Sequence, residues 1–196
     1  KMKAQGYRTI CIHPYDGGFY GRNKVLPALG FDEFIDVRAF NASQKAGPFI
    51  GDCAVAEKIR ELLQAPGRTQ PLFIHAVTME NHGPWKPGRL PGIDDPQAQY
   101  LHHVANTGRM VEDLVAGLDA IARERGQTIT LCVFGDHAPS LPSCKPGFGG
   151  RTTEYALFRF GRPQEAPRRA DIAADELGRA LRGSLATAPA DIAAGT

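Results

Sequence analysis

Residues 8–18 read RTICIHPYDGG, a short apolar run that ends in a polar loop with a histidine. Two later stretches repeat this arrangement: PLFIHAVTMENHGPW at residues 71–85 and TITLCVFGDHAP at residues 128–139. The three runs are continuously apolar rather than alternating, as in strands of a parallel sheet that helices cover on both faces. Because the carboxyl ends of parallel strands line one crevice, we expect the three polar loops to form one site.

Helical patterns alternate with these runs, which is typical of βαβ units. We expect a helix that begins at Asp52 as its cap and stops at residues 65–67, and further helices over about residues 99–125 and 171–185. We expect strands at residues 8–13, 72–79, 128–134 and 155–160, the first three of them central. The sequence therefore predicts an α/β protein, an α/β/α sandwich with a mainly parallel central sheet over residues 1–186, followed by a flexible tail at residues 187–196.

Composition narrows the class of protein. The chain has 196 residues, 42% of them hydrophobic, which suits a single globular domain. Its net charge of +2 comes without a long basic run, so we expect no nucleic-acid partner. No apolar stretch approaches the roughly 20 residues that span a bilayer. Cys11 and Cys132 fall inside strand runs and are expected to be small buried residues, whereas the disulfide state of all four cysteines, Cys53 and Cys144 included, stays open.

Asp136 and His137 are candidate metal ligands. They are adjacent oxygen and nitrogen donors, and Gly135 before them lets the backbone turn so that both side chains face one point. The alternative is structural, with Asp136 capping the following turn and His137 simply exposed.

His82 lies in a loop dense in polar and ring groups, which ends at Trp85. A histidine in such a loop can donate to a phosphate oxygen or move a proton, so His82 is a candidate for catalysis and for substrate binding. Trp85 is a candidate apolar wall for a glycerol or a sugar. The alternative is a loop histidine beside a tryptophan that only packs.

The first loop offers three more candidates. His13 is a candidate catalytic residue, Arg22 can hold a phosphate with its planar fork, and Tyr20 can stack on or hydrogen-bond the same ligand. Arg22 in isolation would be a solvated surface residue. No chemistry is assigned to the remaining histidines, His75, His102 and His103.

Four blocks occur in order along the chain: HPYDGGFYGR at residues 13–22, LGFD at 29–32, TMENHGPW at 78–85 and FGDH at 134–137. Together they resemble the catalytic domain of the lipoteichoic acid synthase and phosphoglycerol transferase family, within the sulfatase and alkaline phosphatase superfamily. The resemblance covers roughly residues 1–160 and matches the C-terminal half of that domain.

The resemblance implies a role for each candidate. Asp136 and His137 would hold one divalent metal, with manganese as the first expectation and magnesium or zinc as alternatives. His82 and Arg22 would bind the phosphate of phosphoglycerol, and His13 matches another active-site histidine. Tyr20 stands where lipoteichoic acid synthases have a tryptophan.

The family's nucleophilic threonine and metal-binding glutamate belong to a segment that would precede residue 1, and Thr152 and Thr153 do not match the threonine's position. Residues 1–6 also look like the last turn of a helix whose start is missing. We therefore expect the N-terminal part of the domain to be absent from this chain and the chain alone to be inactive.

The implied activity is transfer of phosphoglycerol from phosphatidylglycerol to a cell-envelope glycan or a teichoic-acid-type polymer. It implies the extracytoplasmic face of the bacterial cytoplasmic membrane, with an anchor in upstream segments. The alternatives are a sulfatase-like phosphodiesterase, a phosphoethanolamine transferase in capsule or envelope polysaccharide biosynthesis, and a non-catalytic fragment that binds phosphoglycans. A purely structural α/β domain would require three histidine loops to coincide by chance.

Overall fold

The computed structural model describes residues 1–141, 152–163 and 166–186. Its strands are β1 Arg8–Ile12, β2 Glu33–Ile35, β3 Lys45–Ala46, β4 Phe49–Ile50, β5 Leu72–Ala76, β6 Ile129–Phe134 and β7 Tyr155–Phe160. Its α-helices are α1 Arg22–Ala28, α2 Asp52–Gln64, α3 Pro96–Arg125 and α4 Ala174–Ala186. The tail that we expect at residues 187–196 lies outside the described residues.

Strands β2, β1 and β5 form a parallel sheet with β1 in its centre. Ile10 of β1 lies opposite Glu33 of β2 on one side and Ile74 of β5 on the other. Ile10 and Ile12 are completely buried, as expected for a central strand covered by helices. The predicted central strand is therefore confirmed, whereas the sequence analysis missed the three-residue strand β2.

Strand β6 departs from the prediction. It pairs along its whole length with β7 in antiparallel orientation, from Ile129 opposite Phe160 to Phe134 opposite Tyr155. Within the described ranges this pair is a sheet of its own, so the expectation that residues 128–134 form a central parallel strand is wrong. A continuous apolar run shows that a strand is covered, but it does not reveal the direction of the neighbouring strand.

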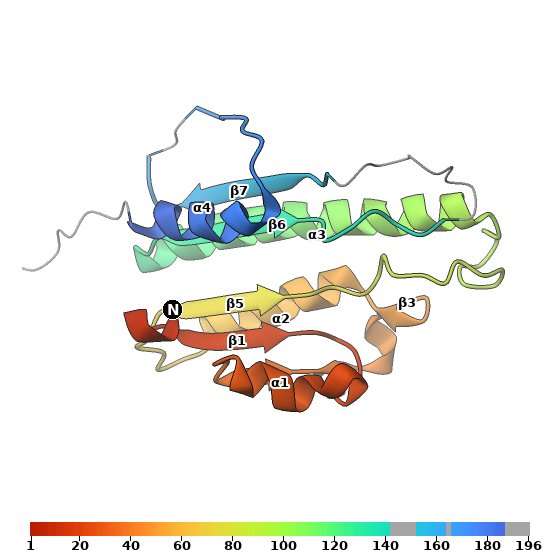
Figure 1. Ribbon diagram of the computed structural model, residues 1–196, viewed down its shortest axis with the longest axis horizontal. Coiled ribbons are helices and arrows are strands. Elements are labelled where there is room, and N and C mark those ends of the chain that lie inside the picture. The colour runs from red at the N-terminus through yellow and green to blue at the C-terminus, as the bar shows by residue number, and fades with distance from the viewer. Residues whose placement is uncertain (142–151, 164–165, 187–196) are drawn as a thin grey trace, which may run out of the picture.

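Helices α2 and α3 join the parallel sheet to the β6–β7 pair. Val55 of α2 packs on Ile10 and Ile12 of the parallel sheet, whereas Leu118 of α3 packs on Phe160 of the antiparallel pair. α2 and α3 also pack against each other. Figure 1 shows β1 and β5 with α1 below and β6, β7 and α4 above. The predicted α/β class is confirmed, with a sheet that is divided into a parallel and an antiparallel part.

The helix ends differ from the predictions by a few residues. Asp52 is the first residue of α2 rather than its cap. α3 begins at Pro96, where the Asp95 side chain accepts a hydrogen bond from the Ala98 amide at 2.8 Å, and it ends before Gly126 as predicted. α4 begins at Ala174, three residues later than expected. No helix in the described part of the chain is long and apolar enough to cross a membrane.

The cysteines in the described ranges are free thiols: Cys11, Cys53 and Cys132. Cys11 is buried in β1, and burial raises the pKa of its thiol to about 11. Such a thiol is inert at neutral pH, because the thiolate is the reactive form. The expectation of a small buried residue is thus confirmed for Cys11, whereas Cys132 is half-buried and Cys144 lies outside the described residues.

Candidate functional site

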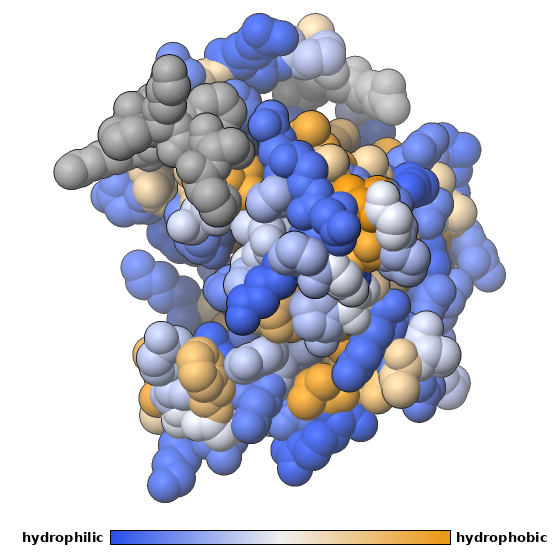
Figure 2. Space-filling view, turned by 90° about the vertical axis from the view of Figure 1, so that its right-hand side faces the viewer, coloured by the Kyte–Doolittle hydropathy of each residue, from blue (hydrophilic) through white to orange (hydrophobic). Residues whose placement is uncertain are grey.

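Strands β1, β5 and β6 run in the same direction, toward the right-hand side of Figure 1. The loops that follow them, which contain His13, His82 and His137, therefore begin at the same end of the molecule. Figure 2 looks onto this end and shows a largely hydrophilic surface. The prediction that the three loops share one end of the fold agrees with this arrangement, although β6 belongs to a separate sheet.

His13 follows β1 directly and is 4% exposed. Its Nδ1–H donates to the carbonyl oxygen of Val77 at 3.0 Å, and its Nε2 is buried without a hydrogen-bond partner among the described residues. Burial lowers the pKa of His13, the hydrogen bond to Val77 raises it, and the nearby positive charges of Arg22, His75 and His82 lower it further. The imidazole is therefore neutral at neutral pH, and Nε2 presents a lone pair that can accept a proton.

Arg22 is the first residue of α1, beside the His13 loop. Its Cζ lies 5.3 Å from the ring centroid of Phe19 and 5.5 Å from that of Tyr20, and its Nη1 is buried without a partner among the described residues. Tyr20 is 80% exposed and has a φ of 56°, a left-handed conformation that is uncommon for an aromatic residue. Such strain is concentrated at functional sites, which agrees with the predicted contact between Tyr20 and a ligand.

His82 is exposed and lies next to Phe49, with 5.9 Å between the ring centroids. Its Nδ1–H donates to the carbonyl oxygen of Gly83 at 2.7 Å, which leaves Nε2 as the nitrogen that can meet a ligand. The Phe49 ring also lies 6.1 Å from that of Tyr15, centroid to centroid, so it contacts both the first and the second predicted loop.

Trp85 is only 8% exposed. Its ring centroid lies 5.4 Å from that of Tyr100, 6.0 Å from that of His103 and 4.2 Å from the Arg89 Cζ. The structure thus buries Trp85 between its own loop and α3, and its contact with a substrate stays a prediction.

The two candidate metal ligands, Asp136 and His137, follow β6 directly. Their side chains are 75% exposed for Asp136 and 69% exposed for His137, with 3.5 Å between Oδ2 and Nε2. The His137 amide donates to Asp136 Oδ1, and its Nδ1–H donates to the carbonyl oxygen of Ala138. Over residues 1–141, 152–163 and 166–186, no group of three or more His, Cys, Asp or Glu side chains is placed to hold a metal ion. The role of Asp136 and His137 as metal ligands stays a prediction.

The sequence analysis missed a buried polar network beneath the His82 loop. Glu80 is 1% exposed and accepts hydrogen bonds from the Asp52 amide at 2.7 Å, from His103 Nδ1 at 2.8 Å and from the Asn106 side chain. His103, to which no chemistry was assigned, is completely buried. A signal was present, because His103 lies seven residues before the buried Met110 on α3 and so shares its apolar face.

Asp52 gives this network a testable dependence on pH. It is completely buried, and its Oδ2 accepts a hydrogen bond from the Thr107 hydroxyl at 2.7 Å. Burial raises the pKa of Asp52 from 3.8 to about 6; the hydrogen bond from Thr107 lowers it and the charge of Glu80 raises it. The pKa of Asp52 is thus higher in the folded protein than in the unfolded chain. The stability that the protonated Asp52 carboxyl contributes is therefore complete below about pH 4 and is lost as the pH rises through about 6.

In the wild type, the charging of Asp52 should lower the free energy of unfolding between pH 4 and pH 7.5 by up to about 3 kcal/mol. The variant Asp52→Asn should lack this loss. Urea unfolding at the two pH values measures this difference. Asp113→Asn, at an exposed position of α3, is the matched control. Equal pH dependence in Asp52→Asn and the wild type would contradict the raised pKa.

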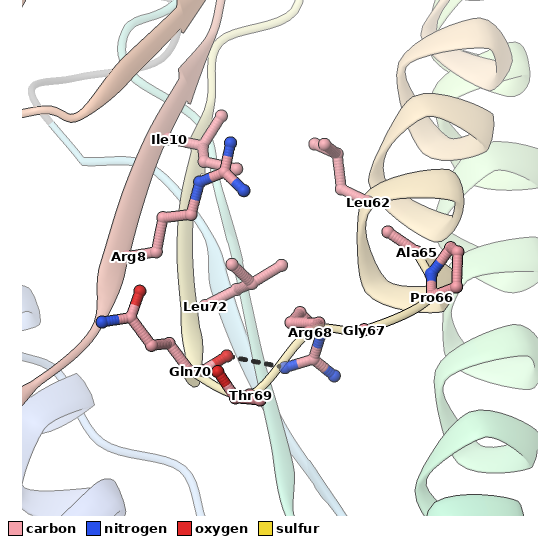
Figure 3. A pocket seen from close by; sticks show the side chains of 10 residues that line it. All are labelled: Arg8, Ile10, Leu62, Ala65, Pro66, Gly67, Arg68, Thr69, Gln70 and Leu72. Atoms are coloured by element: carbon pink, nitrogen blue, oxygen red, sulfur yellow. Dashed lines mark hydrogen bonds between the residues drawn. The ribbon is translucent and has the colours of Figure 1, made fainter.

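A cavity of about 240 Å³ lies at the opposite end of the parallel sheet. Arg8 and Leu72 line it from the starts of β1 and β5, and Leu62 lines it from the end of α2 (Figure 3). Arg68 is held at its edge by a hydrogen bond from Nη1 to the Gln70 carbonyl at 3.0 Å. This cavity contains none of the predicted site residues, so it is distinct from the candidate site.

Residues 1–163 match the sulfatase family. The capsular polysaccharide biosynthesis protein RkpI of Rhizobium meliloti is 30% identical over 186 residues, which are 94% of this chain and 34% of that protein. The chain thus spans about a third of the length of this relative.

Two solved structures share the fold. Lipoteichoic acid synthase LtaP from Listeria monocytogenes aligns with a TM-score of 0.58 and 21% identity, covering 69% of this chain and 35% of that one. The Streptococcus pyogenes phosphoglycerol transferase GacH, in complex with sn-glycerol-1-phosphate, aligns with a TM-score of 0.57 and 21% identity, covering 79% of this chain and 44% of that one. The alkaline phosphatase and sulfatase type of fold predicted from the sequence is thereby confirmed.

Proposed function

Because the chain belongs to the sulfatase family, we propose that its site binds the phosphate of a phosphoglycerol group and takes part in the transfer of that group to a cell-envelope glycan. The observation that carries this proposal is a pair of buried nitrogens, His13 Nε2 after β1 and Arg22 Nη1 at the start of α1, for which the described part of the chain offers no hydrogen-bond partner. Buried polar atoms are normally hydrogen-bonded, so an unpaired acceptor and an unpaired donor in one place suit a ligand with both a hydroxyl and an anionic group. A phosphoglycerol group has both.

Each side chain then has a distinct role. The Arg22 guanidinium holds phosphate oxygens with charge-assisted hydrogen bonds, and its stacking on Phe19 and Tyr20 fixes its plane. His82 Nε2 donates to a further phosphate oxygen when the ring is protonated. Neutral His13 accepts a proton at Nε2 from a hydroxyl group of the donor or of the acceptor.

The proposed reaction has two steps. In the first step, a threonine outside residues 1–196 loses its hydroxyl proton and its oxygen bonds to phosphorus, while the diacylglycerol oxygen takes up a proton and leaves. In the second step, an acceptor hydroxyl loses its proton and bonds to phosphorus, and the threonine oxygen takes up a proton as its bond to phosphorus breaks. Within this chain, His13 is the base that takes a hydroxyl proton, and Arg22 and His82 hold the phosphate oxygens. The paired oxygen and nitrogen donors of Asp136 and His137 fit a divalent metal such as manganese, magnesium or zinc, with a glutamate outside this chain as a further ligand. When bound, such a metal neutralises phosphate charge and lowers the pKa of a nucleophile.

The proposal also covers donor, acceptor and location. The donor would be a phosphatidylglycerol-type lipid, the acceptor an envelope glycan or a teichoic-acid-type polymer, and the site would lie on the extracytoplasmic face of the cytoplasmic membrane. RkpI, a capsular polysaccharide biosynthesis protein, supports an envelope acceptor, and the sn-glycerol-1-phosphate in GacH supports the donor group. Anchoring would come from segments upstream of residue 1.

A second candidate is a module that binds phosphoglycans without turnover. One observation favours it: among the described residues, no third His, Cys, Asp or Glu side chain forms a metal-binding group with Asp136 and His137. In this case Arg22 and His82 would still bind phosphate, but added metal would not change the affinity.

Turnover of a fluorescent phosphatidylglycerol analogue with manganese tests the transferase proposal. The assay compares residues 1–196 with a form extended upstream through the segment in which the resemblance places the threonine. We expect release of diacylglycerol from the extended form alone, and its loss in His137→Ala. If the extended form binds glycerol phosphate but releases no diacylglycerol at any metal concentration, the binding module is supported instead.

A further inference from the structure

We infer that Arg89 is a positioning residue that fixes the backbone around His82, and that the buried pair Glu80 and His103 sets its orientation. The inference deepens the proposed function, since it rests on His82 as a phosphate ligand. Neither the family match nor the sequence motifs assign a role to Arg89.

Arg89 donates hydrogen bonds to three carbonyl groups of the loop that carries His82. Its Nη1 donates to the carbonyl oxygens of His82 at 2.8 Å and Pro84 at 3.0 Å, and its Nη2 donates to that of Glu80 at 2.7 Å. Its Cζ also lies 4.2 Å from the ring centroid of Trp85. One side chain thus fixes the backbone before, at and after His82, so the direction of that imidazole depends on Arg89.

The buried pair determines how Arg89 is held. Its Nε–H donates to His103 Nε2 at 3.1 Å, so this nitrogen must carry a lone pair. His103 Nδ1 therefore carries the proton and donates to Glu80 Oε1 at 2.8 Å. Glu80 Oε2 accepts from the Asp52 amide at the start of α2. The side chain of Arg89 is thereby connected to α2 and α3, two helices that form part of the core.

This geometry requires a guanidinium group. Arg89 uses three nitrogens in one plane, pointing in different directions, whereas the donors of a lysine all radiate from a single atom. Arg89→Lys keeps the charge and most of the volume but cannot reach the three carbonyls and His103 together. The substitution therefore separates the positioning role of Arg89 from its charge.

The test uses the chain with 15N-labelled histidines and sn-glycerol-1-phosphate as the probe, and compares Arg89→Lys with Arg123→Lys, an exposed arginine paired with Asp119. We expect a folded Arg89→Lys, a shifted His82 imidazole resonance in the absence of ligand, and about tenfold weaker binding of the probe. Arg123→Lys should match the wild type in all three. An unchanged His82 resonance and unchanged affinity in Arg89→Lys would overturn the inference.

A second measurement needs no variant. The 15N shifts of wild-type His103 should show a neutral ring with the proton on Nδ1 at pH 7, and a protonated Nε2 would overturn the inference. Both the His103 tautomer and the His82 shift in unliganded protein can be read even if the wild type fails to bind the probe. Failure of the proposed function is thus distinguishable from failure of this inference.

Discussion

Replacing Arg22 by alanine is expected to weaken the binding of sn-glycerol-1-phosphate by about 10- to 100-fold. The guanidinium has a buried nitrogen without a partner among the described residues, and a hydrogen bond to a charged group contributes about 1.5–3 kcal/mol. Stacking on Phe19 and Tyr20 already orders the side chain, so little conformational entropy is lost on binding. Isothermal titration calorimetry of the purified chain measures the affinity.

Lys24→Ala is the matched control for this prediction. Lys24 is an exposed residue of the same helix, and its removal changes the net charge by the same amount. Its effect should stay below about threefold, since exposed charges are screened by salt. Equal losses in the two variants would show that Arg22 acts only through its long-range charge, which would contradict a direct phosphate contact.

Replacing Glu80 by alanine is expected to lower the free energy of unfolding by about 3–5 kcal/mol, because each buried donor left without an acceptor costs about 1–3 kcal/mol. The carboxylate is 1% exposed, and its removal leaves the Asp52 amide, His103 Nδ1–H and the Asn106 side chain without their acceptor. The amide of Asp52 belongs to the first turn of α2, where a negative charge also stabilises the helix. Urea unfolding followed by circular dichroism measures the loss.

Glu112→Ala provides the comparison, because Glu112 is an exposed carboxylate on α3. Its effect should stay within about 0.5 kcal/mol. A similarly small effect for Glu80→Ala would mean that water or rearranged side chains replace the lost carboxylate, and the network would then not be a structural support of the His82 loop.

Much of the site's location was predictable from the sequence. The apolar runs before His13 and His82 identified two parallel strands, and the rule that ligands bind at the carboxyl ends of such strands placed their loops together. The hydrogen bond from His13 Nδ1–H to the Val77 carbonyl oxygen joins the starts of these two loops. Local periodicity was sufficient here because burial of a strand on both faces leaves a direct signal in the residue types.

Two features were not predictable by the same means. The antiparallel partner of β6 could not be foreseen, because an apolar run carries no information about the direction of its neighbour. The network of Glu80, His103 and Arg89 depends on contacts between a loop and α3, and the sequence separation of 23 residues between Glu80 and His103 hides this pairing. Trp85 is buried against Arg89 and α3, and its predicted contact with a ligand stays a prediction.

The most direct test of a phosphoglycerol site at the end of β1 is a titration of the 15N-histidine-labelled chain with sn-glycerol-1-phosphate, followed by NMR. The account predicts that the imidazole resonances of His13 and His82 shift together and saturate with one dissociation constant, while exposed His102 on α3 does not move. Saturating shifts confined to other histidines, or no shift at His13 and His82 at millimolar ligand, would contradict it.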